Sequence, residues 1–390
     1  MKYILVIAVF AVYGVLVGII NGNSMGDIIS NANVFVSILY VVILVVLINN
    51  DKTIINRLIN LFTTYNAGIG LILYVVFKVS HYLILSKVQV VAQIDFIESK
   101  LHYGIISGYL YGDQYPRLYI ANGIFLQIAL AICMVKMAYA GKKAFFNGNT
   151  LKILLILMGI VTTGTRGYWT GAAVVGLGVI LMLRKARLVP LIIKILIIML
   201  CAGLALSDWG ILSSGGQKSS VLQGLVKRAG TTTEFSSGEV SNNIRAIQIE
   251  YLTKSIKAHP IIGSGFGARI DQYEKETDRS GLNFELYYLE LWFKTGLIGV
   301  LVLFAGFAHL LYASYKTVRS MSNVEEKSNI TGWLIGFFSV AVTSATNPYF
   351  AGAHGFFVIV FLIVMLELYN ENSEKIHLLE LSKNVQGEKK

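Results

Sequence analysis

Long apolar runs recur along this chain from Tyr3 to Tyr369, and short polar segments separate them. Many of these runs approach the roughly 20 residues that an α-helix needs to cross the hydrocarbon core of a bilayer. Most of the polar segments between them are too short to form a separate soluble domain. The pattern therefore predicts an all-α fold, a polytopic transmembrane helix bundle of about ten spans.

The predicted spans fall into two groups around one long polar segment. We expect transmembrane helices 1–7 within residues 1–206, a large outward loop over 207–286, helices 8–10 within 287–370, and a charged tail over 371–390. The first apolar run is long and shows no clear cleavage pattern, so we interpret it as a helix and not as a signal peptide. The individual spans are predicted at 3–20, 34–49, 58–77, 118–138, 151–164, 168–183, 188–206, 287–312, 331–346 and 355–369, with a partial eleventh at Val79–Leu85.

Composition supports a membrane protein and changes the meaning of the net charge. Of the 390 residues, 55% are hydrophobic and 14% are charged, and the mean hydropathy of +0.64 exceeds that of soluble domains. A net charge of +11 is compatible with nucleic-acid binding, but the Lys and Arg residues gather in alternate connections between spans. The positive-inside rule places these connections and both termini in the cytoplasm, and no nucleic-acid partner is expected. The basic connections contain Lys52 and Arg57; Lys136, Lys142 and Lys143; Arg184, Lys185 and Arg187; and Lys316, Arg319 and Lys327.

The remaining connections are predicted to face outward. They comprise a short loop over 21–33, a longer loop over 86–117, the hinge at 162–168, the segment 207–284 and a turn at 346–355. Of these connections, only the segment 207–284, of roughly 80 residues, is long enough to carry much structure outside the bilayer. Loops of that length are usually functional. Its beginning is rich in Ser, Gly and Thr, whereas Asn243–Ala258 has helical spacing and is expected to form a short helix on the membrane surface.

The first group of polar residues that could carry chemistry is Thr162–Gly167, a hinge between two apolar runs with Arg166 at its centre. Gly164, Thr165 and Gly167 would let main-chain N–H groups approach a ligand, and an arginine beside them suits a phosphate. The alternative is that Arg166 only ends a helix at the membrane interface.

A second group follows the predicted outer helix. Arg245 lies on that helix, and His259 begins the sequence HPIIGSGFG. The glycines do not indicate a dinucleotide site, because no strand precedes them and no βαβ unit can be built there. Arg245 could equally be a solvated surface charge, and His259 before Pro260 is more typical of a helix end than of a catalytic group.

Two carboxylates, Glu285 and Glu290, enter an apolar aromatic helix where the outer loop returns to the membrane. Five residues apart on a helix, they are offset by about 140° and do not share a face. A desolvated Glu can act as a general base, and for Glu290 we prefer an ion pair with Lys294 at the favourable four-residue spacing. Tyr288 beside them is a candidate substrate-binding residue.

A further arginine, Arg117, precedes a span and either anchors it at the interface or adds a cation to the site. Together Arg117, Arg166 and Arg245 would form an electropositive cluster at the outer surface, which suits a pyrophosphate. Cys133 and Cys201 lie within apolar runs, so we expect neither a disulfide nor a metal site from them.

The order of these segments resembles the superfamily of O-antigen polymerases (Wzy-type) and O-antigen ligases (WaaL-type), which are bacterial envelope glycosyltransferases. TGTRG at a span boundary is followed by a large outer loop, an arginine helix leading to HPIIGSGFG, and then ELYYLELWFKTGLIG. The resemblance is clearest over Leu151–Phe304. It implies that Arg166 is the arginine of the family's TG[ST]RG segment and that Arg245 is the arginine ahead of the glycine-rich segment.

One departure from the family concerns the general base. Its ligases commonly carry His-Asn-x-x-Leu, whereas alignment on Leu289 puts Glu285 and Leu286 at the His and Asn positions. Either Glu285 acts as the base, or the base lies elsewhere, with His259 and His354 as substitutes, or the acceptor is activated by positioning alone. We prefer Glu285, because a partly desolvated carboxylate can accept a hydroxyl proton.

The resemblance implies a polymerase that transfers a growing glycan from undecaprenyl pyrophosphate onto an incoming lipid-linked repeat unit. Arg166 and Arg245 would bind the pyrophosphate, no cofactor or metal is expected, and the site would face the periplasm from the bacterial inner membrane. The lipid bilayer, a chain-length regulator and a flippase are the expected partners. Three alternatives stay open: an O-antigen ligase acting on lipid A core, a transporter or flippase of lipid-linked sugars, and a structural membrane scaffold.

Overall fold

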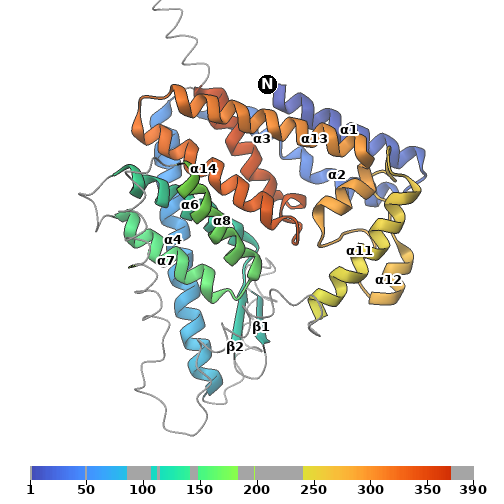
Figure 1. The fold of residues 1–390 in the computed structure, drawn as a ribbon, viewed down its shortest axis with the longest axis horizontal. Coiled ribbons are helices and arrows are strands. Elements are labelled where there is room, and N and C mark those ends of the chain that lie inside the picture. Colours follow the sequence, from blue (N-terminus) through green and yellow to red (C-terminus); the bar gives the residue numbers. More distant parts are fainter. Residues whose placement is uncertain are drawn as a thin grey trace, which may run out of the picture. The chain divides into compact units, whose positions relative to one another are not determined.

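The computed structural model describes residues 2–48, 51–85, 107–111, 115–140, 148–182, 197 and 240–369, and most of them are helical (Figure 1). The predicted helical character of the fold is therefore confirmed. The elements in chain order are α1 (Lys2–Ile20), α2 (Met25–Val36), α3 (Leu39–Ile48), α4 (Lys52–Leu85), β1 (Ser107–Tyr111), β2 (Tyr115–Tyr119), η2 (Ala121–Gly123), α6 (Ile124–Tyr139), α7 (Gly148–Thr162), α8 (Arg166–Met182), α11 (Val240–Ala258), α12 (Asp271–Thr277), α13 (Tyr287–Ser320), α14 (Val324–Thr343), η3 (Tyr349–Ala351) and a helix over Ala353–Tyr369.

One hairpin departs from the all-α expectation. β1 and β2 pair antiparallel, with Tyr109 opposite Arg117 and Leu110 opposite Pro116. Tyrosines at four positions of the two strands favour the extended conformation. A proline is tolerated because both strands of a two-stranded sheet are edges, where a missing N–H disrupts no second neighbour.

Within the described residues, four helical segments are long and apolar enough to cross a membrane: Tyr3–Ile20, Met25–Ile48, Thr53–Val79 and Tyr287–Ser320. Four shorter apolar helices accompany them, at Ile124–Tyr139, Gly148–Thr162, Arg166–Met182 and Ala353–Tyr369. These agree with the predicted membrane character, while the count of about ten spans stays a prediction.

Several predicted boundaries are wrong, and two of them change the interpretation of a segment. The outward loop expected over 21–33 is reduced to 21–24, because α2 begins at Met25. Its polar residues, which suggested a loop, lie on one side of α2 and bind a later segment, while Ile28 is buried against α1. The separate partial span expected at Val79–Leu85 is the end of α4, which continues without a break.

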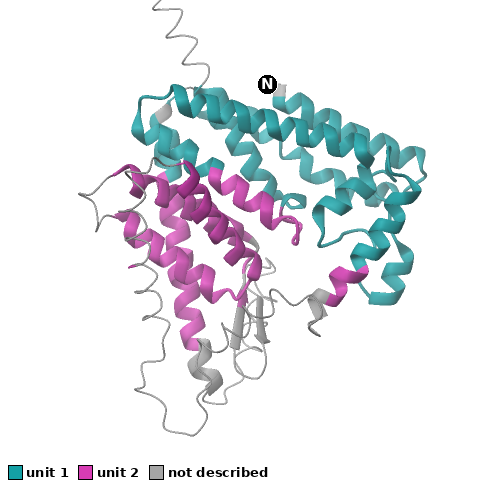
Figure 2. Ribbon diagram, viewed as in Figure 1, with its two compact units in different colours: residues 1–59, 248–334, 350–390 teal, residues 60–247, 335–349 magenta. Residues whose placement is uncertain are grey.

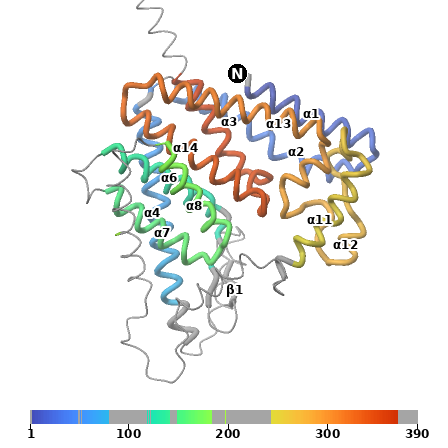
Figure 3. Tube along the Cα trace, in the orientation of Figure 1, coloured from blue at the N-terminus to red at the C-terminus, as the bar shows by residue number. Residues whose placement is uncertain are grey.

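The chain divides into two compact units (Figure 2), each of which is described by itself. Unit 1 comprises Met1–Ile59, Gln248–Leu334 and Phe350–Lys390, and unit 2 comprises Asn60–Ile247 and Ile335–Tyr349. In unit 1, α1 packs along α13 and α2, as the chain trace shows (Figure 3). The core there contains Phe10, Ile28, Phe266, Leu291 and Leu303.

In unit 2, α6 is buried on nearly all sides and packs against α7 and α8. Small residues allow the close helix contacts that membrane proteins use. A Cβ on Gly70 of α4 would lie 2.3 Å from the carbonyl oxygen of Leu155, so α4 and α7 meet at a glycine. Gly171 of α8 leaves the space that the buried Gln127 side chain occupies, and the Ser339 hydroxyl lies 2.6 Å from the Gln127 oxygen.

Candidate functional site

The predicted hinge around Arg166 is a tight turn between two helices of unit 2. α7 ends at Thr162 and α8 begins at Arg166. Gly164 has φ +60°, a conformation that residues with a side chain rarely adopt. The Thr163 hydroxyl accepts the main-chain N–H of Thr165 over 3.2 Å, so the turn is supported by its own side chains.

Arg166 occupies the first position of α8, where its side chain is partly exposed. Two hydrogen bonds hold the first turn of this helix. The Tyr168 hydroxyl donates to the Ile120 carbonyl over 3.1 Å, and the Trp169 indole donates to the Ile160 carbonyl over 3.1 Å. A helix N-terminus carries a partial positive charge, to which the guanidinium adds a full one. The local field of this corner therefore favours an anion.

The turn after α14 lies against the same corner, a relationship that was not predicted. A Cβ on Gly167 would be 2.9 Å from the side-chain nitrogen of Asn347 and 3.2 Å from the Tyr349 hydroxyl. Tyr349 also stacks on Tyr168, with ring centroids 5.8 Å apart. Gly167 is thus required for the close approach of Asn347, whose Asn-Pro sequence was the available signal of a turn.

The helix predicted over Asn243–Ala258 is confirmed as α11, while its position outside the membrane stays a prediction. The residues of α11 are divided between the two units. The helix ends at Ala258, and the exposed His259 follows, as expected for a residue before proline. The buried side of α11 is formed by Gln248, Leu252 and Ile256, each of which is at most 8% exposed. Arg245 is partly exposed, three residues before Gln248.

The glycine-rich segment after α11 threads between α1, α2 and α13 of unit 1. Gly263, Gly265 and Gly267 have φ of +83°, +82° and +80°. A Cβ on Gly265 would lie 2.2 Å from the main-chain nitrogen of Gly18, and the Phe266 ring sits where a Cβ of Gly14 would be. These glycines serve close packing between backbones, which agrees with the rejection of a dinucleotide loop.

The same segment fills a break in α13. Gly296 has φ +61° and ψ −173°, so the helix is interrupted there. The N–H groups of Ser264 and Gly265 donate to the carbonyls of Phe293 and Lys294, over 2.9 and 2.7 Å. In return, the N–H groups of Leu297 and Ile298 donate to the carbonyls of Pro260 and Ile261, over 3.0 and 3.1 Å. The main-chain groups that the break leaves without a helical partner are thereby paired.

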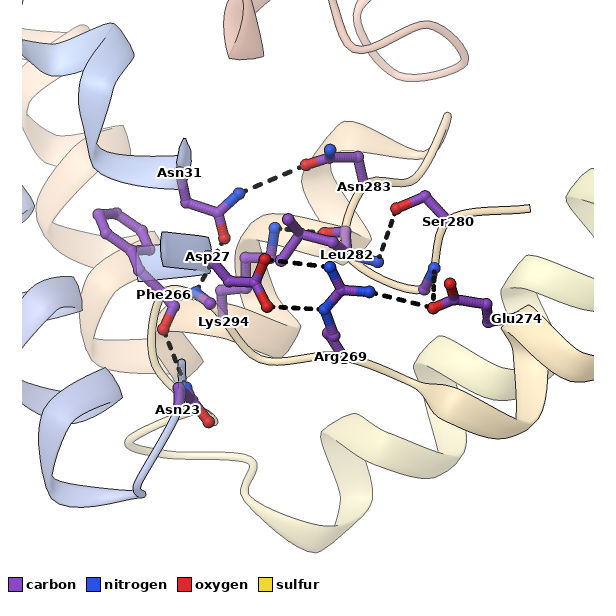
Figure 4. Close-up of polar contacts among 12 residues, drawn as sticks. Asn23, Asp27, Asn31, Phe266, Arg269, Glu274, Ser280, Leu282, Asn283 and Lys294 are labelled. Atoms are coloured by element: carbon purple, nitrogen blue, oxygen red, sulfur yellow. Dashed lines mark hydrogen bonds and ion pairs between the residues drawn. The ribbon is translucent and has the colours of Figure 1, made fainter. Parts of the chain in front are cut away.

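A polar network ties this segment to α2 (Figure 4). Arg269 donates two hydrogen bonds to Asp27, over 2.7 and 3.0 Å, and a third to Glu274 over 3.2 Å. The hydrogen bonds with Asp27 raise the pKa of the Arg269 guanidinium further above its already high ordinary value. Asn23 donates to the carbonyls of Ser264 and Phe266, and Asn31 accepts the N–H of Gly267. Arg269 is therefore engaged in holding the fold.

The predicted ion pair between Glu290 and Lys294 is confirmed. The two charged atoms are 2.5 Å apart, and the side chains are 8% and 5% exposed. Lys294 also donates to the Leu282 carbonyl over 2.7 Å, and Glu290 accepts the N–H of Phe284 over 3.1 Å. The pair thus fixes the segment that immediately precedes Glu285.

Glu285 itself is held from two further sides. Its main-chain N–H donates to the Gln248 side chain over 3.0 Å, and its carboxylate accepts from Arg279 over 3.1 Å. The Gln248 amide also donates to the Tyr273 hydroxyl over 2.9 Å. Sequence reasoning missed both Gln248 and Arg279. The signal for Gln248 was a polar residue on the apolar side of the predicted helix.

The other predicted site residues are placed as follows. Tyr288 lies on α13, partly buried between the rings of Tyr287 and Phe304. His354 is exposed, and the side chain of Arg117 lies outside the described residues. Because nothing is described of the Arg117 side chain, the cluster of Arg117, Arg166 and Arg245 stays a prediction. So does their grouping with Glu285, which belongs to unit 1, whereas Arg166 and Arg245 belong to unit 2.

Comparison with known proteins supports the family that the order of the motifs suggested. No curated protein matches the chain. A chain from the structure described as "Structural coordination of polymerization and crosslinking by a peptidoglycan synthase complex" is 12% identical, with a TM-score of 0.42 over 95% of this chain and 97% of that one. Residues 151–304 match the family model Wzy_C, described as O-antigen ligase. The resemblance to the superfamily of O-antigen polymerases and O-antigen ligases, predicted from the order of the motifs, is thereby confirmed.

Proposed function

We propose that the protein is a lipid-linked polysaccharide polymerase of the bacterial inner membrane, with its active site on the periplasmic face. One observation carries the proposal: the segment that matches the O-antigen ligase family, 151–304, contains Arg166, Arg245 and Glu285. The four long apolar helices support a membrane location. The comparison gives no support to a transporter.

The proposed donor is a glycan on undecaprenyl pyrophosphate. Arg166 and Arg245 bind the pyrophosphate and stabilise the charge that develops on it as it leaves. The N-terminus of α8, with Gly164, Thr165 and Gly167 around it, supports this role because helix N-termini favour phosphates.

Glu285 is the proposed general base. It removes the proton from a hydroxyl of the acceptor sugar, and that oxygen forms a bond to the anomeric carbon of the donor. The bond from the anomeric carbon to the pyrophosphate oxygen breaks, and undecaprenyl pyrophosphate leaves with the electron pair. The supports from Gln248, Arg279 and the Glu290–Lys294 pair fit a carboxylate that must be held in one place.

An O-antigen ligase is the second candidate, because the same family match covers it. A ligase would use the same donor and transfer the glycan to lipid A core. The presence of glutamate at position 285, where the family's ligases commonly carry histidine, is the observation that favours the polymerase.

The test replaces each proposed residue in a strain that lacks the native gene. Arg166→Ala, Arg245→Ala and Glu285→Gln are expected to abolish long surface glycan, which gel electrophoresis of the extracted polysaccharide measures. Lys257→Ala and Glu250→Gln are matched controls, since both residues are exposed on α11. Glycan of full length from all three variants would contradict the proposed roles of these residues and the polymerase assignment.

A second experiment separates the two transferases. Purified protein in vesicles receives either lipid-linked repeat units alone or lipid-linked glycan with lipid A core. Lengthening of the lipid-linked glycan supports the polymerase, and attachment to lipid A core without lengthening supports the ligase.

A further inference from the structure

Two large apolar side chains are exposed within the predicted outward loop. Ile261 and Ile262, which follow α11, are 59% and 55% exposed. They lie in the segment 207–286, which was expected to be outside the bilayer. The exposure of two adjacent isoleucines in water would be unfavourable, so the surroundings of this segment need an explanation.

The main chain places this segment beside a candidate membrane span. The carbonyls of Pro260 and Ile261 accept the N–H groups of Leu297 and Ile298 on α13. The Trp292 indole donates to the Pro260 carbonyl over 3.0 Å. Pro260–Ile262 therefore lies at the level of the break in α13.

The length of α13 indicates the depth of that break. A straight helix of 34 residues would be about 51 Å long, well beyond the roughly 30 Å of bilayer hydrocarbon. The uncharged stretch from Gly296 to Tyr315 matches the hydrocarbon thickness, and Lys316 follows it. This places Gly296 at the outer boundary of the hydrocarbon. Trp292 lies about one turn further out, at the interface that tryptophan prefers.

The exposed surface is continuous from the loop onto α13. Leu297 and Ile298 are 41% and 42% exposed, and Leu301 and Phe304, further along the helix, are 59% and 47% exposed. The surface formed by these four residues with Ile261 and Ile262, which we term the apolar ledge, thus continues the lipid-facing side of the span.

We infer that Pro260–Ile262 dips into the outer leaflet of the bilayer, where the apolar ledge contacts the acyl chains of membrane lipids. Irregular main chain is tolerated at this depth only when its polar groups are paired, and the carbonyls of Pro260 and Ile261 are paired with α13. The inference does not depend on the transferase activity. It means that the outer loop is anchored in the membrane at the end of α11.

The test uses the full-length protein, with both native cysteines replaced by Ala, in vesicles of phosphatidylcholine and phosphatidylglycerol. Single cysteines at Ile261 and Ile262 carry a bimane label, and lipids with a nitroxide on the acyl chain quench it. Leu301→Cys is the control for lipid contact, and Lys257→Cys, at an exposed position of α11, is the control for water contact.

Quenching at 261 and 262 is expected to agree with that at 301 within about twofold, and to exceed that at 257 several-fold. The inference would be overturned by labels at 261 and 262 that the lipid nitroxide quenches as weakly as the label at 257, and that aqueous iodide quenches. Labels shielded from both quenchers would overturn it too, because a protein partner would then cover the ledge.

A measurement on the wild-type chain guards against variants that do not fold. Vesicles that contain a lipid with a diazirine on its acyl chain are irradiated, and crosslinked residues are identified by mass spectrometry. Crosslinks at 261 or 262 alongside 301 and 304 are expected. Crosslinks confined to α13 would contradict insertion of the loop.

Discussion

The main-chain N–H of Glu285 and the side-chain oxygen of Gln248 are joined by a hydrogen bond of 3.0 Å. Gln248 is 2% exposed and reaches from α11 to the segment before α13, across 37 residues of sequence. The part of α11 that begins at Gln248 therefore supports the segment that carries Glu285.

Gln248→Ala is expected to destabilise the protein by about 1–3 kcal/mol, because it leaves the N–H of Glu285 and the hydroxyl of Tyr273 without their partner. Gln248→Leu is the control: it keeps a similar side-chain volume and loses both hydrogen bonds. Thermal unfolding of purified protein in detergent measures the difference. A Gln248→Leu protein as stable as wild type would show that packing, and not hydrogen bonding, matters at this position.

The Glu290–Lys294 pair is expected to behave as a buried pair. Lys294→Met should cost about 3–5 kcal/mol, because it leaves the Glu290 carboxylate buried without a counter-charge. The double variant Glu290→Gln/Lys294→Met should be more stable than Lys294→Met, since glutamine can still accept the N–H of Phe284. A double-mutant cycle of unfolding temperatures checks this. Additive losses would mean that the two charges do not interact.

Gly265→Ala is expected to prevent the protein from folding correctly, because its φ is +82° and the new Cβ would lie 2.2 Å from the nitrogen of Gly18. Gly176→Ala is the matched control, since nothing lies within 4 Å of its Cβ position in α8. There the change should stabilise the helix by up to about 1 kcal/mol. Size-exclusion profiles of the detergent-extracted proteins report both outcomes, and a monodisperse Gly265→Ala protein would contradict the packing described.

Arg279→Ala should leave the unfolding free energy within about 1 kcal/mol of wild type, because the ion pair with Glu285 is partly exposed and is screened by water. If Glu285 is the base, transfer should nevertheless fall about tenfold, since the carboxylate loses the group that orients it. Lysine at this position should restore part of the activity. Wild-type transfer rates in Arg279→Ala would remove Arg279 from the site.

A pH effect is expected at the start of α4. The hydroxyl and main-chain N–H of Thr53 hold the pKa of the Asp51 carboxyl below its ordinary value of 3.8. A lowered pKa stabilises the fold above the ordinary value, and this contribution is lost as the pH falls through the folded pKa. The unfolding temperature of wild type should thus exceed that of Asp51→Asn at pH 6, and the difference should shrink as the pH falls below 3.8. A difference that is constant with pH would count against the charged cap.

The helices and the ion pair were predictable from local rules. Lys294 follows Glu290 by one helical turn, and the run of apolar residues around them indicated a helix without any tertiary information. The hinge before Arg166 was equally visible, because Gly164 interrupts two apolar runs.

The break in α13 and the supports of Glu285 were not predictable in the same way. A glycine such as Gly296 is usually tolerated inside a helix, so it does not by itself predict a break. The break can be recognised only from the main chain that pairs with α13 there, which lies about thirty or more residues earlier in the sequence. Gln248 and Arg279 make contacts that depend on how α11 and α12 fold back onto α13. Such long-range contacts leave no periodic signal in the sequence.

The surface of α1 at Gly14 and Gly18, against which Phe266 packs, has a consequence for synthesis of the chain. Gly14 and Gly18 leave the ribosome early, but Phe266, which fills the space above them, is made about 250 residues later. At about 5–20 residues per second, the first helix waits about 12–50 s in the membrane before its partner exists. During that interval a second copy of the helix, or a lipid chain, can occupy the same surface. Any such contact must be displaced when the segment of Phe266 arrives, and the rate of translation sets how long the competing contact survives.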